Sequence, residues 1–251
     1  MFLVLVCHPL IHLAYAVELD SKEVGMEALA LTAVCYDFLH VYVDESRFTR
    51  VSSRGMSGDL LALLAEVRRD GALRWSGEDG TEELYAKRED EMMEYWNAWD
   101  LTDPVRQFEN SQRTAVALLC ATGSYDFAFV QGLAASHAIR VLLPVVPAEW
   151  HLRLVRQWWL VTLGIYVVQQ RPEIRLDDIH GFDVGDKDWA WVERQGLERE
   201  GWNMDAHYVG AIRALRECAN LWGDEDQYFL KAAVKFAGEF DGWAPNRAQS
   251  E

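Results

Sequence analysis

The stretch that decides the fold is residues 111–170, SQRTAVALLCATGSYDFAFVQGLAASHAIRVLLPVVPAEWHLRLVRQWWLVTLGIYVVQQ. It is strongly apolar, and its apolar residues follow helical spacing rather than the alternation of a strand. Gly123-Ser124 separates a first helix from a second, and Pro144 and Pro147 separate the second from a third at about Ala148 to Gln169. Because no strand-like alternation is sustained elsewhere either, we expect an all-α fold.

The flanking sequence continues the helical pattern. Asp20 is expected to cap a helix through Cys35, and Ser57 a helix that Gly71 ends. Residues 71–110 are rich in charge, Gly and Asp, and predict a surface excursion with one short helix near 91–99. Residues 171–189 resemble loop, and two more helices are expected near 203–221 and 225–240. We therefore expect one multi-helix, bundle-like domain over residues 1–251 with long charged loops.

Composition narrows the class of protein. The net charge of −16 repels phosphate backbones and anionic headgroups, so neither nucleic acid nor a membrane surface is an expected partner. The apolar run 158–168 is too short to span a bilayer. The N-terminal segment has no Lys or Arg before Lys22, which disfavours a signal peptide despite Ala14-Tyr15-Ala16. The four scattered cysteines fit reduced thiols in a cytoplasmic protein.

Histidine supplies the main candidates for chemistry, because imidazole is the commonest metal ligand and a proton shuttle near neutral pH. His8 and His12 stand four residues apart, which on a helix places them on one face, about 6 Å apart at Cβ. Pro9 suits a first helical turn, with His8 at the cap. The pair is either a metal site or structural, one histidine capping the helix and the other bonded within the core.

Two further histidines lie on expected helices. His137 follows Ser136 in an apolar helix, and His207 follows Asp205, which either caps that helix or supports the imidazole. Each is a candidate ligand or a satisfied structural histidine. Lys231 either faces the interior, with a lowered pKa, or lies at the surface.

Several common catalytic motifs are missing from the sequence. There is no G-x-G-x-x-G after a strand, no P-loop, no H-E-x-x-H and no G-x-S-x-G elbow. A Rossmann nucleotide site, a zinc-protease site and a Ser-His-Asp hydrolase are therefore not supported. The eleven tryptophans, by contrast, offer walls for a flat aromatic ligand.

Six segments carry a family resemblance and together span nearly the whole chain: HPLIHLAYA at 8–16, MEALA at 26–30, YDFAFV at 125–130, SHAIRVLLP at 136–144, VQQRPEI at 168–174 and DAHYVGAIRAL at 205–215. Their order and spacing resemble the questin-oxidase-like family, whose members include fungal polyketide-tailoring enzymes that act on anthraquinone-type and aflatoxin-pathway aromatics. Family members are much longer, so the resemblance implies a C-terminal part of the family fold, and one hypothesis is that Met1 is not the true start.

The resemblance implies an oxygen-dependent oxidoreductase of the Baeyer–Villiger or ring-cleaving kind, acting in secondary metabolism on a polycyclic aromatic ketone or quinone. It implies dioxygen and NADPH, and in some members one non-heme Fe(II) held by histidines and a carbamylated lysine. On this basis His8, His12, His137 and His207 are the predicted catalytic and metal-binding set.

The chain departs from the family pattern in its candidate site. Gln131 stands where a histidine is expected, and Gly210 stands where a lysine is expected, with Lys231 the nearest substitute in sequence. The alternative is therefore a non-catalytic binding module, a pseudoenzyme with the scaffold but an incomplete metal site. An aromatic polyketide-like small molecule is the expected partner in either case, and uncovered apolar helix faces would favour self-association.

Overall fold

The computed structural model describes residues 2–75 and 80–244, with side chains described from Cys7 onward. Over these residues the chain is helical and contains no β-strand, which confirms the all-α prediction. The helices are α1 Phe2–Glu18, α2 Lys22–Val34, α3 His40–Asp44, α4 Leu60–Arg69, α5 Thr81–Asn97, α6 Phe108–Cys120, α7 Phe127–Leu142, α8 His151–Val168, α9 Asp177–His180, α10 Trp189–Glu198, α11 Ala206–Trp222 and α12 Tyr228–Glu239.

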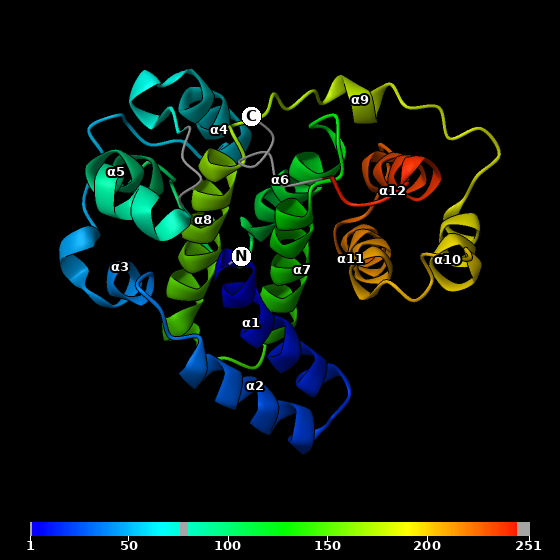
Figure 1. Ribbon diagram of the computed structural model, residues 1–251, viewed down its shortest axis with the longest axis horizontal. Coiled ribbons are helices and arrows are strands. Elements are labelled where there is room, and N and C mark those ends of the chain that lie inside the picture. Colours follow the sequence, from blue (N-terminus) through cyan, green and yellow to red (C-terminus); the bar gives the residue numbers. More distant parts are fainter. Residues whose placement is uncertain (1, 76–79, 245–251) are drawn as a thin grey trace.

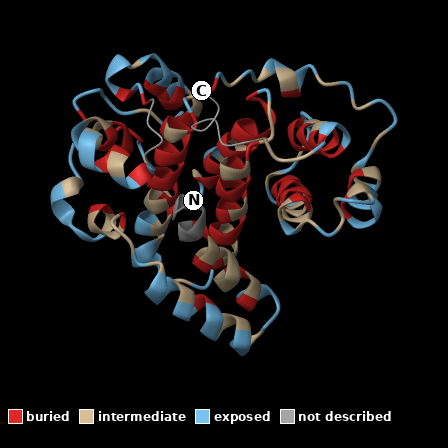
Figure 2. Ribbon diagram, viewed as in Figure 1, coloured by how far each residue is buried: buried red, intermediate tan, exposed pale blue. Residues whose placement is uncertain are grey.

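The centre of the molecule is formed by α6, α7 and α8, the helices of the stretch 111–170 (Figure 1). These helices are buried along most of their length, because they are apolar on nearly every face (Figure 2). α1 packs against α7 and carries α2, which projects from the body. α3, α4 and α5 lie on the α8 side, and α9 to α12 lie on the other.

Aspartate and serine caps set the beginnings of several helices. Asp126 and Asp205 accept backbone N–H bonds at the starts of α7 and α11. The predicted caps of two earlier helices were wrong by one or two residues. Ser21, not Asp20, caps α2, and Asp59, not Ser57, caps α4. In both cases the observed cap is the residue directly before the first helical position.

The prediction that residues 71–110 form a surface excursion is wrong for α5, and residues 76–79 of this range lie outside the described residues. α5 runs over 17 residues within it and buries Tyr85, Trp96 and nearby apolar side chains against α8. Tyr85 Oη donates to the carbonyl oxygen of Leu160 at 2.6 Å, and Trp96 Nε1 donates to that of Arg156 at 2.9 Å. The charged cluster at residues 87–91, which indicated a surface segment, lies on the exposed and half-buried side of this helix.

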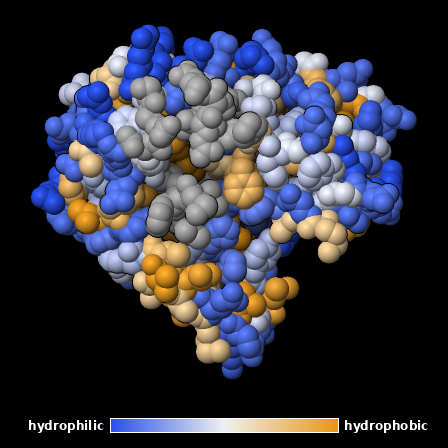
Figure 3. Space-filling view, viewed as in Figure 1, coloured by the Kyte–Doolittle hydropathy of each residue, from blue (hydrophilic) through white to orange (hydrophobic). Residues whose placement is uncertain are grey.

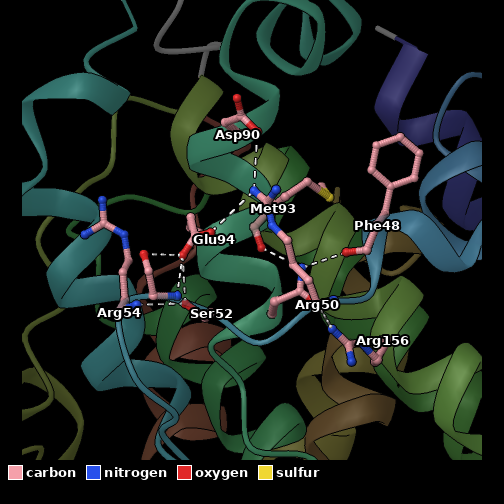
Figure 4. A network of polar contacts seen from close by, with 10 residues as sticks. Phe48, Arg50, Ser52, Arg54, Asp90, Met93, Glu94 and Arg156 are labelled. Carbon is pink, nitrogen blue, oxygen red and sulfur yellow. Dashed lines mark hydrogen bonds and ion pairs between the residues drawn. The ribbon is translucent and has the colours of Figure 1, made fainter.

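A polar network fastens the segment before α4 to α5 (Figure 4). Asn97 Nδ2 donates to the carbonyl oxygen of Phe48 at 2.8 Å, and Asn97 Oδ1 accepts from Arg156 at 2.8 Å. Glu94 accepts bonds from Ser52 and Ser53, and the Ser53 bonds hold the pKa of this carboxyl below its usual value. The segment is thus held by side-chain hydrogen bonds together with one isolated backbone bridge, between Ser57 and Trp99.

The first helix begins earlier than expected. α1 starts at Phe2, so Pro9 lies inside it rather than in its first turn, and His8 is not a cap residue. Pro9 has no N–H to donate to the preceding turn, a defect that packing on α7 must offset. Within the described part of the chain, no helix has the length and apolar character that a membrane span requires.

Candidate functional site

Three of the four predicted histidines gather where α1 meets α11. His8 and His12 lie on one face of α1, with ring centroids 6.3 Å apart and planes at 71°. The ring of His207, in the first turn of α11, lies 6.4 Å from that of His8 at 80°. The three rings therefore form a row with His8 in the middle. The row joins α1 to α11, although His12 and His207 are 195 positions apart in the sequence.

His207 is the most firmly held of the three. Its backbone N–H donates to Asp205 Oδ1 at 2.9 Å, and Asp205 Oδ2 accepts from Trp243 Nε1 at 3.0 Å. The ring of Phe127 lies edge-on to the imidazole, with centroids 4.6 Å apart, and packs in turn on Trp243. Asp205 thus caps α11 and anchors an aromatic wall beside His207.

Gln131 completes this cluster from α7. Its Nε2 lies 2.9 Å from Nδ1 of His207. An amide NH₂ can only donate, so Nδ1 accepts and the proton of the neutral ring sits on Nε2. Burial lowers the pKa of His207, His8 lowers it further and Asp205 opposes the shift, so the ring is neutral at pH 7. Gln131 is fully buried, and its Oε1 has no hydrogen-bond partner.

The fourth predicted residue, His137, lies against different groups. Its Nε2 is 3.5 Å from Oε1 of Glu18 at the end of α1, and the same oxygen accepts from Arg213 of α11 at 2.7 Å. His137 is buried, with neither ring nitrogen in a hydrogen bond. Since it lies six residues beyond Gln131 on α7, the helix rise separates the two by about 9 Å. The structure thus gathers His8, His12 and His207, and places His137 elsewhere.

The spacing of the row bears on the predicted iron. With metal–nitrogen distances of about 2.1 Å, two imidazole ligands have centroids about 5.3 Å apart in tetrahedral geometry and about 6.5 Å apart only when opposite. The row measures 6.3 and 6.4 Å, and His8 can lie opposite only one neighbour. No group of three or more His, Cys, Asp or Glu residues suited to a metal exists among the described residues. As placed, these side chains do not fit one shared metal ion.

Gln131 and Gly210, the two departures from the family pattern, both lie close to His207. Gln131 lies directly on His207, so the position where a histidine is expected does belong to the cluster. Gly210 lies one turn beyond His207 on α11, and open space surrounds the point where its Cβ would be. Lys231 is remote: its Nζ donates to the carbonyl oxygen of His180 at 2.9 Å, beside α9. Lys231 therefore supplies no ligand to this cluster as placed.

Sequence reasoning missed four residues of this region. Phe127 lies four residues before Gln131, so helical spacing would have placed both on one face of their helix. Arg213 lies six residues beyond His207, so helical spacing does not place it on the face of His207. Trp243 lies after the last helix and Glu18 at the end of the first. Neither shows a local pattern, because both reach the site only through tertiary packing.

The comparisons with known proteins add one result. A family model described as questin oxidase-like matches residues 2–215, which include His8, His12, Gln131, His137 and His207. A comparison with curated proteins finds no match.

Proposed function

Since the chain belongs to the questin oxidase-like family, whose name indicates an oxidoreductase, we propose that it oxidises a polycyclic aromatic ketone or quinone beside His207. The reaction proposed is oxygen insertion of the Baeyer–Villiger type or oxidative ring cleavage. The observation that carries the proposal is the meeting of His8, His207 and Gln131, which come from three helices and all lie within the family match.

The role of His207 follows from its protonation. Because Nδ1 accepts from Gln131, the neutral ring presents an Nε2–H donor. Such a donor can bond the carbonyl oxygen of a bound ketone and stabilise the negative charge that develops there when an oxygen nucleophile adds to the carbon. Gln131 is then a positioning residue that fixes the tautomer, and His8 and His12 are the neighbouring groups able to move a proton.

The aromatic residues supply a binding surface. Phe127 stands edge-to-face against His207, Trp243 stands edge-to-face against Phe127, and Trp243 is fixed through Asp205. Flat apolar rings pack well on such a wall. The net charge of −16 favours a neutral substrate over an anionic one.

The redox balance of an oxygen insertion requires two electrons. In the proposed reaction one oxygen atom of O₂ enters the substrate and the other leaves as water, and NADPH supplies the electrons. The sequence has no nucleotide-binding fingerprint, and the histidine row does not fit a shared metal as placed. NADPH is therefore proposed from the electron balance alone, and no residue of this chain is assigned to hold NADPH or Fe(II).

Oxygen uptake by the purified full chain tests the function. We expect consumption of O₂ that depends on a hydroxyanthraquinone and NADPH together. His207→Ala is expected to lower the rate by about 100-fold, since removing one donor to a developing oxyanion costs about 10²–10³ in kcat. His180→Ala is the matched control, because that imidazole is exposed in α9. Substrate-dependent uptake unaffected by His207→Ala would contradict the proposed site.

A second candidate function is supported by the same residues. Gln131 and Gly210 replace groups expected in a complete metal site, which favours a non-catalytic binding module that retains the aromatic wall. Metal analysis and ligand binding separate the two candidates. One iron per chain, lost on His12→Ala, supports an iron oxygenase. Ligand binding with no metal and no oxygen uptake supports the binding module.

A further inference from the structure

A second region of the molecule has the features of a small-molecule site. A cavity of about 260 Å³ lies between α1, the α2–α3 connection and α8. Its apolar side is formed by Pro9, Leu10 and Leu13 of α1, with Leu39 and Val43 opposite. Sites for drug-sized ligands start at about 300 Å³, so this cavity suits a molecule of one or two rings.

One edge of the cavity carries an oriented imidazole. His40 Nδ1 lies 3.2 Å from Asp44 Oδ2, and the same oxygen accepts from Tyr36 Oη at 2.9 Å. The Tyr36 ring also stacks on the imidazole, with centroids 3.9 Å apart and planes at 26°. Two hydrogen bonds and a stack therefore fix the direction of the His40 ring. A simple i,i+4 ion pair on a surface helix would involve His40 and Asp44 alone, whereas here Tyr36 contacts both.

The charges around His40 define what the ring can bind. The hydrogen bond from Tyr36 lowers the pKa of Asp44, which is therefore a carboxylate at neutral pH. The carboxylate can only accept, so Nδ1 donates to it and the neutral form of the ring presents its lone pair on Nε2. A ligand that bonds Nε2 of the neutral ring must therefore be a donor. The carboxyls of Asp37 and Asp44 both line the cavity, which disfavours an anion, although Arg153 and His40 act on Asp44 with the opposite sign of charge.

We propose that this cavity binds a small, neutral aromatic alcohol, with its ring on the apolar α1 side and its hydroxyl donating to Nε2 of His40. Pro9, Leu10 and Leu13 belong to a different face of α1 from His8 and His12, the face on which the His8 ring meets His207. The site is therefore additional to the one proposed for oxidation, and its ligand class does not depend on that proposal.

Equilibrium dialysis with three matched probes tests the site. 1-Naphthol is expected to bind about tenfold more tightly than naphthalene, because one hydrogen bond contributes about that factor, and 1-naphthoate is expected to bind more weakly than either. His40→Phe keeps a ring for Tyr36 to stack on but removes the acceptor. It should reduce the affinity for 1-naphthol to that for naphthalene while leaving naphthalene binding unchanged.

Variants elsewhere locate the binding and separate the two sites. Leu13→Trp fills the cavity and should abolish binding of both neutral probes, whereas His207→Ala should alter neither. Circular dichroism verifies that each variant is folded. Equal affinities for 1-naphthol and naphthalene, or a loss of 1-naphthol binding in His207→Ala rather than in His40→Phe, would overturn the proposal. Neither result would bear on oxygen uptake at His207, which is measured separately.

Discussion

His137 combines burial with two ring nitrogens that form no hydrogen bond. An imidazole in such surroundings resists protonation, because the charged form loses its hydration. Burial is the largest influence on its pKa and lowers it. Glu18 and Glu217 oppose the shift, while Arg213 and Arg140 add to it. Among the described residues, Glu18 is the acidic group in ion-pair contact with His137, and its contacting oxygen is already bonded to Arg213. His137 is therefore held neutral in the folded protein.

This neutrality predicts a sensitivity of stability to acid. In the unfolded chain His137 has its ordinary pKa of 6.5, and in the folded protein the pKa is lower. Between these values the unfolded state binds more protons, so the free energy of unfolding falls as the pH decreases below about 6.5, by at most about 1.4 kcal/mol per pH unit. Urea unfolding of His137→Gln at pH 7.5, 6.5 and 5.5 should show a shallower fall than the wild type. His180→Gln should keep the wild-type slope, and equal slopes in both variants would contradict the assignment.

Two helical glycines differ in the space that a Cβ atom would have. Gly210 lies inside α11 with open space around its Cβ position, whereas a Cβ on Gly164 of α8 would lie 3.1 Å from the Tyr85 ring and 3.3 Å from Thr81. We expect Gly210→Ala to raise the free energy of unfolding by about 0.5–1 kcal/mol, because alanine favours the helix. We expect Gly164→Ala to lower it, by about 1–3 kcal/mol, because α5 and α8 must separate. Guanidinium unfolding of both variants measures the difference, and a loss of stability in Gly210→Ala would show that this space is occupied.

Sequence patterns predicted some of the helices well and others poorly. Helical spacing in residues 111–170 identified α6, α7 and α8 closely, since burial on most faces leaves a continuous apolar signal. It failed for α5, whose charged outer face hid Tyr85 and Trp96, and for α1, where Pro9 suggested a start rather than an interior position. The shared helix face of His8 and His12 could be predicted, because it depends only on their spacing within one helix. The contacts of His207 with Gln131, and of His137 with Glu18, were not, because they depend on how α1, α7 and α11 pack.

At the scale of the whole molecule, the net charge opposes self-association, whereas the exposed apolar surface favours it. The net charge of −16 makes two copies repel. Yet α2 projects from the body with a largely exposed, apolar outer face, on which Met26, Leu29 and Val34 are 65%, 62% and 83% exposed (Figures 2 and 3). Contiguous apolar surface of this kind favours association, while the repulsion between copies is weakened by salt.

We therefore expect self-association that increases with salt concentration. Raising the ionic strength from about 0.1 M to about 1 M shortens the screening length from about 10 Å to about 3 Å, which suppresses the repulsion but leaves apolar contacts intact. Sedimentation velocity should show a larger associated fraction at high salt, and the double variant Leu29→Gln, Val34→Gln should remove it without changing the net charge. Met204→Gln is the control, since this side chain is 90% exposed but lies far along the chain, before α11. Association that survives the double variant, or that decreases with added salt, would show that α2 is not the contact surface.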